Sequence, residues 1–288
     1  MNGAGVIVAY AIQESIRRRV FVVVVLLTLG FLALYALGVR QAFAELDEFT
    51  EGTEAGEVLD SVTVAGTTLF GLSLFATLFL GAVLAVFLTL NVVRGDAERG
   101  LLQPLVVRPV GRTTLLLARF GAAAAVCAVY VWIVFTAALL ITHWLGDGWW
   151  PDRYVRPALG LAGAVILVVA LSVLGSALFT GTANGIAIFM LFGAGLVAGL
   201  LGQIGEALGS ETLEQVATAS SWVLPFEALY QDALHEISAE SFGLTRVALQ
   251  LGPFGGAEAG GAGLWFYAAA YLGVVLGLAV LSFARRDL

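Results

Sequence analysis

Six apolar segments constrain this chain more than any other feature of its sequence. A helix needs about 20 consecutive apolar residues to cross a bilayer, and each of the six reaches that length. They cover residues 20–39, 64–93, 114–145, 157–180, 184–206 and 264–283. Hydrophobic residues make up 60% of the 288 residues, and charged residues only 12%. The sequence therefore predicts an all-α integral membrane protein with six transmembrane helices in a single membrane domain, residues 1–288.

Arginine predicts how these helices are oriented, because short arginine-rich loops stay in the cytoplasm. Three basic segments alternate along the chain with two acidic loops. The basic segments are Arg17–Arg19, 94–119 and Arg285–Arg286, and the acidic loops are 40–61 and 207–263. Both termini are therefore predicted inside and both acidic loops outside, where they are solvated. The loop at 146–156 is ambiguous, since Arg153 and Arg156 are matched there by aspartates.

The most distinctive of the basic segments is 94–113, a compact, charged and proline-punctuated stretch between the second and third apolar segments. Ionised side chains at the centre of a bilayer cost several kcal/mol each. The segment must therefore lie in water or against a soluble protein. We expect it to be a docking site for a cytoplasmic partner.

Short helices are predicted in two further stretches. Residues 1–19 have apolar side chains near helical spacing, which suits an amphipathic helix on the cytoplasmic interface; a simple extension of the first span fits the periodicity equally well. Within the extracytoplasmic segment 207–263, Glu211–Ala219 and Phe226–Ile237 are expected to be helical, with a break marked by Ser220, Ser221 and Pro225. The loop tryptophans Trp144, Trp149 and Trp150 are typical of an interfacial aromatic belt.

Several kinds of chemistry are disfavoured by the residues that the chain contains. It has no lysine and so cannot carry a G-x-x-x-x-G-K phosphate loop. Its spans offer no midplane carboxylate of the kind that ion-driven carriers use. Two histidines, His143 and His235, and one cysteine, Cys127, make a metal centre a weak hypothesis. We expect no catalytic site, metal or cofactor in this chain, so any transport must be powered by a partner.

Small residues four apart allow helices in lipid to approach closely. The fifth apolar segment has two overlapping pairs of this kind, which include Gly195, Gly199 and Gly202, and the sixth has Gly273 and Gly277. The pair in the sixth segment is expected to pack within the chain. The glycines of the fifth segment are candidates for the dimer interface or the transport pathway, and packing within one chain explains them equally well.

The basic segment resembles the cytoplasmic pattern between spans two and three of ABC type-2 (ABC-2) transporter permeases. The matching positions are Glu98, Gly100, Leu102, Pro109, Val110, Arg112 and Arg119. Leu101, Gly111 and Arg119 replace the usual Thr, Ser and Lys, and Pro104 is an addition that should shorten or kink a helix. Residues 14–21, 224–230 and 285–287 also resemble family segments.

The resemblance implies a half-transporter: two permease chains, in a homodimer, with two copies of a separate cytoplasmic ABC ATPase that binds ATP and Mg²⁺. It implies that residues 94–113 form the coupling helix, seated in a groove of the ATPase. The coupling residues would be Asp96, Glu98, Arg99, Gly100, Arg108, Pro109 and Arg112. The interface helix, with Glu14, Arg17, Arg18 and Arg19, would be a second contact.

Together these observations favour the permease subunit of an ATP-driven exporter. Spans almost free of charge suit a hydrophobic or amphipathic substrate, and the second and fifth spans are the candidates to face the dimer axis. The alternative is a membrane assembly or signalling subunit, for example in metalloenzyme maturation, that uses ATPase motion without classical transport. Membrane lipid is an expected partner, an extracytoplasmic protein is another candidate, and nucleic acid is not expected. Arginine in place of lysine, with abundant Ala, Gly, Val and Leu, suggests a GC-rich bacterium and hence its inner (cytoplasmic) membrane.

Overall fold

The computed structural model describes residues 12–14, 19–50, 55–90, 111–238 and 259–285. The helices in these ranges are α2 (Arg19–Thr50), α3 (Ala55–Thr89), α5 (Arg112–Leu145), α6 (Val155–Leu178), α7 (Gly181–Leu208), α8 (Glu211–Val223), α9 (Pro225–Ser238) and α11 (Gly261–Ala284). No strand occurs in the described part of the chain. Six of these helices, α2, α3, α5, α6, α7 and α11, are long and apolar enough to span a membrane. The predicted all-α fold with six spans is confirmed.

The first two spans are longer than predicted. The helix α2 continues to Thr50 and α3 begins at Ala55, so most of the acidic stretch 40–61, expected as a solvated loop, is helical. Its Ala, Leu and Glu residues are strong helix formers, and Gln41 donates a hydrogen bond of 3.0 Å to Glu45 one turn later. At 1.5 Å per residue the 32 residues of α2 measure about 48 Å, well beyond a hydrocarbon core of about 30 Å.

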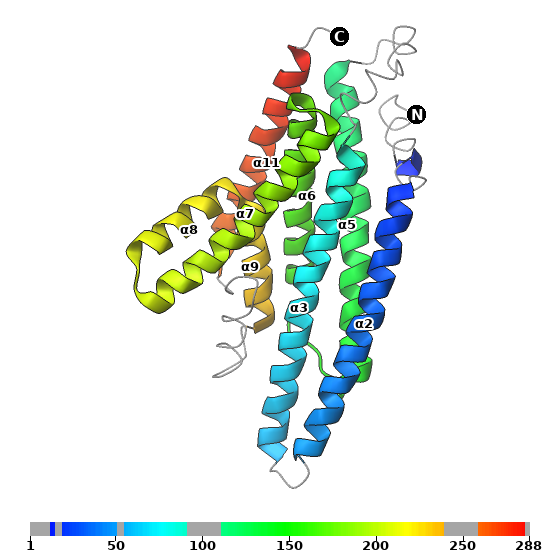
Figure 1. Cartoon of the computed structure of the whole chain (residues 1–288), viewed down its shortest axis with the longest axis vertical. Helices are drawn as coiled ribbons and strands as arrows, with labels where there is room; N and C mark the ends of the chain where they lie inside the picture. The colour runs from blue at the N-terminus through cyan, green and yellow to red at the C-terminus, as the bar shows by residue number, and fades with distance from the viewer. Residues whose placement is uncertain (1–11, 15–18, 51–54, 91–110, 239–258, 286–288) are drawn as a thin grey trace.

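The helix α6 lies in the middle of the bundle and packs against α3, α5, α7, α9 and α11 (Figure 1). Along most of its length its side chains are buried, and many of them are Ala, Gly or Ser. Small side chains let neighbouring helices come close. By contrast, most side chains of α2 and α11 lie on the outside of the bundle.

The bundle has two distinct ends. The starts of α2 and α5 and the last turn of α11 lie together at one end, which we call the terminal end (Figure 1). The end of α2, the start of α3 and the turn between α5 and α6 lie at the opposite, distal end. An even number of spans requires the start of the first span and the end of the last to lie at the same end of the bundle.

A polar network joins three helices near the terminal end. Thr89 on α3 donates a hydrogen bond of 2.6 Å to the hydroxyl of Ser172 on α6. Asn184 on α7 donates through Nδ2 to the Ser172 carbonyl oxygen at 3.0 Å. All three residues are buried. A buried polar group is costly unless it is hydrogen-bonded, so these contacts fix the positions of α3, α6 and α7 relative to one another.

Near the distal end, an aromatic side chain closes the turn between α5 and α6. Trp149 is only 8% exposed and packs against Phe70 of α3, with the ring centroids 5.8 Å apart. Gly66 makes room for it, because a Cβ there would lie 2.5 Å from the indole ring. The expected aromatic belt is therefore wrong for Trp149, whereas Trp144 and Trp150 are exposed.

Candidate functional site

Between the fifth and sixth spans, residues 211–238 form a hairpin of two helices that folds back into the bundle. The helix α8 runs back along α7, and α9 then inserts beside α6, α3 and α11 (Figure 1). The chain breaks at Leu224, and Pro225 opens α9, a position where proline loses no helical hydrogen bond. Both short helices predicted from the sequence are present, with the break a few residues later than Ser220. The predicted amphipathic helix is thus buried in the bundle.

The glycines of α7 receive this hairpin. A Cβ on Gly195 would lie 2.6 Å from Cζ of Phe226, and one on Gly199 would collide with the carboxylate of Glu227. A Cβ on Gly202 would lie 3.0 Å from the Cβ of Ala217 on α8. These three glycines therefore allow close packing within one chain, which the sequence favoured no more than a role in the dimer interface or the transport pathway.

The opposite face of α7 carries large apolar side chains. Ile186, Met190, Val197 and Ile204 are 47–71% exposed, and at 100° per residue they fall on one stripe of the helix. The three glycines lie on the other side of the same helix. An apolar stripe on a membrane helix faces either lipid or another protein, so this stripe is the part of α7 available to a second copy.

In α11 the structure contradicts the expectation that Gly273 and Gly277 pack within the chain. A Cβ on either residue would have no other part of the described chain within 4 Å, apart from the nearby backbone of α11 itself. Their neighbours Val274 and Leu278 are at least half exposed. This face of α11 points away from the rest of the described chain.

The acidic and amide side chains of α9 form two pairs, each spaced four residues apart, and all are nearly inaccessible. Glu227, Gln231, Asp232 and Glu236 are each at most 8% exposed. Gln231 donates a hydrogen bond to the Glu227 carboxylate one turn away. Burial raises the pKa of the neighbouring Tyr230 hydroxyl, and the negative charge of Glu227 raises that pKa further. Tyr230 therefore stays a neutral phenol beside a carboxylate.

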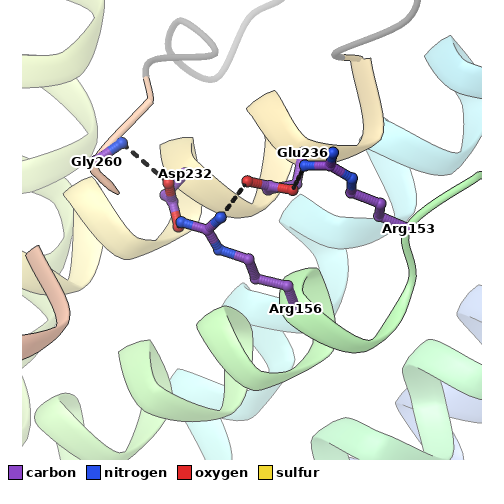
Figure 2. Close-up of polar contacts among 5 residues, drawn as sticks. All are labelled: Arg153, Arg156, Asp232, Glu236 and Gly260. Atoms are coloured by element: carbon purple, nitrogen blue, oxygen red, sulfur yellow. Dashed lines mark hydrogen bonds and ion pairs between the residues drawn. The ribbon is translucent and has the colours of Figure 1, made fainter. Parts of the chain in front are cut away.

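Two arginines from the start of α6 and the loop before it neutralise the far end of α9 (Figure 2). Arg156 contacts Glu236 at 2.6 Å and Asp232 at 3.6 Å, and Arg153 contacts Glu236 at 3.1 Å. Asp232 also accepts a hydrogen bond of 2.9 Å from the backbone N–H of Gly260, just before α11. The carboxylates are buried, whereas the side chains of Arg156 and Arg153 are 40% and 63% exposed. These contacts tie α9 to α6 and to the start of α11.

Sequence reasoning did not find this ion-pair cluster. It compared Arg153 and Arg156 with the aspartates of their own loop, but their partners come from a helix about eighty residues later. One signal was present: Asp232 and Glu236 are four residues apart and so share a face of α9. That face of α9 meets Arg153, in the loop before α6, and Arg156, in the first turn of α6.

The predicted coupling residues lie almost entirely outside the described part of the chain. Asp96, Glu98, Arg99, Gly100, Arg108 and Pro109 fall there, as do Arg17 and Arg18 of the interface helix. Arg112 is the first residue of α5 and Arg19 the first of α2, and Glu14 lies in the helical stretch 12–14. The helices α2 and α5 begin at the terminal end of the bundle (Figure 1). The helix that follows the coupling region, α5, therefore begins at the same end of the bundle as α2.

Comparison with protein families decides what kind of membrane protein this is. The sequence matches the model of the ABC-2 family transporter protein over residues 6–288, nearly the whole chain. The chain belongs to this family. No curated protein matches the sequence.

Family membership and six spans identify the chain as a multi-pass membrane permease of an ABC transporter. Subunits of this family generally are not catalytic themselves and work with an ABC ATPase. Within the described residues, no group of three or more His, Cys, Asp or Glu could hold a metal ion.

Replacing single glycines tests the packing of the hairpin in the permease. Gly195→Ala should lower the thermal stability of the detergent-solubilised protein, by about 1–3 kcal/mol, because the added methyl meets the Phe226 ring. The matched control is Gly273→Ala, where the methyl meets nothing and better helix propensity should leave stability unchanged or raise it by up to about 1 kcal/mol. Equal effects of the two substitutions would contradict this packing.

Removing each arginine separately tests the cluster in Figure 2. Arg156→Gln leaves two buried carboxylates without their main countercharge and should destabilise the protein by about 1–3 kcal/mol, less than a fully buried pair because the guanidinium is partly exposed. Arg153→Gln removes a more exposed contact and should cost under about 1 kcal/mol. Thermal unfolding followed by circular dichroism measures both. A larger loss for Arg153→Gln would show that the cluster is assigned wrongly.

Proposed function

We propose that this permease forms a homodimer that exports a hydrophobic or amphipathic substrate, powered by two copies of a separate cytoplasmic ABC ATPase. The observation that carries the proposal is the family match over residues 6–288, together with six spans. In such a transporter, ATP binding acts by favouring one arrangement of the permease over another through differential contacts.

The proposed point of entry for that force is the segment 94–113. The helix before it, α3, ends at Thr89, and the helix after it, α5, begins at Arg112. Thr89 belongs to the buried network with Ser172 and Asn184. A displacement of α3 would therefore reach α6 and α7 through hydrogen bonds that cannot stretch without exposing buried polar groups.

The proposed substrate class rests on the character of the spans. The stretch of α3 from Ser61 to Thr89 contains no Asp, Glu, Lys or Arg, and the exposed stripe of α7 is apolar. Such walls offer no fixed charge to replace the hydration of an ion. They suit molecules whose surface is largely hydrocarbon.

The proposed dimer places the apolar stripe of α7 against a second copy or across the pathway from it. The fifth span was expected to face the dimer axis, and the proposal places that contact on the face of α7 opposite the hairpin. The chain orientation proposed with it has both termini in the cytoplasm of a bacterial cell and the α8–α9 hairpin entering from outside.

Cysteine cross-linking tests the dimer. In a Cys127→Ala background, Met190→Cys and Val197→Cys should give disulfide-linked dimers in membranes on oxidation, because both positions are exposed on the stripe. Gly195→Cys is the control, since its face is occupied by Phe226 of the same chain. Dimers from position 195, with none from 190 or 197, would overturn the arrangement. Non-reducing gel electrophoresis gives the readout.

Coupling is tested by co-expressing the permease with a candidate cytoplasmic ABC ATPase from the same genome. Replacing Glu98 and Arg112 together with Ala should detach the ATPase or abolish its stimulation by substrate, while the spans stay folded. Arg40→Ala is the control, a single arginine on α2 on the distal side of its midpoint. The measurements are co-purification yield and ATPase activity in proteoliposomes. Normal coupling in the double variant would contradict the docking role, and stimulated ATPase activity without substrate movement would contradict export.

A further inference from the structure

A groove runs between α2 and α5 on the outside of the bundle. It has a volume of about 440 Å³ and is lined by α2 from Phe21 to Leu32, by α5 from Ala125 to Val134, and by Ile12. Its position is separate from the α7–α8–α9 hairpin and from the glycine faces. Apart from one Thr and one Tyr, every lining side chain is apolar.

The two polar side chains in the wall of the groove form a hydrogen bond with each other. Thr28 and Tyr130 are hydrogen-bonded through their hydroxyl groups, and the Thr28 hydroxyl is also 2.7 Å from the Val24 carbonyl oxygen of its own helix. Both residues are buried at this contact. The wall therefore presents hydrocarbon along its length, and an occupant gains nothing there from polar groups.

The length of the groove along α2 matches the thickness of the hydrocarbon layer of one leaflet. Eleven residues separate Phe21 from Leu32 on α2, a rise of about 16 Å at 1.5 Å per residue. Half of a hydrocarbon core of about 30 Å is about 15 Å. Phe21 lies two residues after the start of α2, and the lining residues of α5 lie around the middle of that helix, so the groove runs from the terminal end of α2 toward the middle of the bundle.

Positive charge lies above the apolar part of the groove. Arg119 of α5 is seven and fourteen residues before the lining residues Val126 and Ile133, and residues seven apart share a helix face. It therefore lies about 10 Å above Val126 toward the terminal end. On α2, Arg19 is exposed at the first residue, directly after Arg17 and Arg18 in the sequence. Basic sites between transmembrane helices at a membrane surface bind anionic lipid headgroups.

We propose that this groove is a binding site for one anionic phospholipid of the leaflet at the terminal end, with an acyl chain between α2 and α5 and the phosphate at Arg119. This lipid comes from the bilayer that surrounds the helices. Its headgroup is selected by charge and its chain by the apolar wall. This proposal does not depend on which substrate is transported, so the experiment below tests it independently of the proposed function.

The test uses the full-length permease in nanodiscs of equal parts dioleoyl phosphatidylglycerol and dioleoyl phosphatidylcholine, followed by mild extraction and native mass spectrometry. The wild type should retain phosphatidylglycerol at least fivefold over phosphatidylcholine. Ala125→Phe fills the groove from an exposed position and should reduce retained lipid of both kinds at least fivefold. Arg119→Gln should keep a bound lipid but lose the preference for phosphatidylglycerol.

The matched control is Ala270→Phe on an exposed position of α11, which should retain lipid like the wild type. Gel filtration and thermal unfolding identify any variant that fails to fold, and Ala125→Leu then replaces Ala125→Phe. Equal retention of the two lipids by the wild type overturns the charge selection. Undiminished retention by folded Ala125→Phe or Ala125→Leu overturns the site, whether the groove holds a second copy, a segment of this chain or nothing.

Discussion

The close approach of five helices to α6 is the constraint on which the rest of the structure depends. Helices in lipid gain little from hydrophobic burial, because the surrounding chains are as apolar as leucine, and they associate through close packing and polar contacts. The residues of α6 meet that requirement. A Cβ on Gly160 would lie 3.2 Å from the Leu229 carbonyl oxygen of α9, and Val165 fits against Gly81 of α3, where a Cβ would lie 2.8 Å away. A bulkier α6 would push α3 and α9 outward together.

Polar contacts near the two ends of α6 restrict different neighbours. Near the terminal end, Ser172 links α3 and α7. Near the distal end, Arg156 holds two carboxylates of α9, and α9 in turn reaches the backbone before α11. Buried polar contacts of this kind select one register, because a shift by one residue would leave charges or hydroxyl groups unpaired. The helix α6 is therefore held from both ends, whereas most side chains of α2 and α11 and the apolar stripe of α7 lie on the outside of the described bundle.

Sequence reasoning succeeded where a physical rule is local. Six spans follow from the length and continuity of the apolar segments, and the helices α8 and α9 follow from their periodicity, with the break at Pro225. The excess length of α2 and α3 was missed because acidity was taken as a sign of a loop, although Glu-rich stretches such as 45–48 are good helix formers.

Tertiary relations were harder to predict. Gly195 meets a residue of α9 and Gly273 meets no described neighbour, yet glycine spacing is identical whether a face is filled by the same chain, another copy or lipid. The partners of Arg156 lie far along the chain, so no local window contains the pair. The coupling residues, by contrast, came from a family pattern, and the family itself is confirmed.

The ion-pair cluster also sets an order of assembly during synthesis. The ribosome completes Arg153 and Arg156 long before it reaches Asp232 and Glu236, and Gly260 follows later still. The carboxylates of α9 can leave water only when the start of α6 is already in place, and their last hydrogen bond forms only when the chain enters α11. A nascent chain that stops before α9 holds a central helix with one face uncovered, and insertion of the final helix closes the structure. Membrane integration of this protein is therefore completed from its C-terminal side.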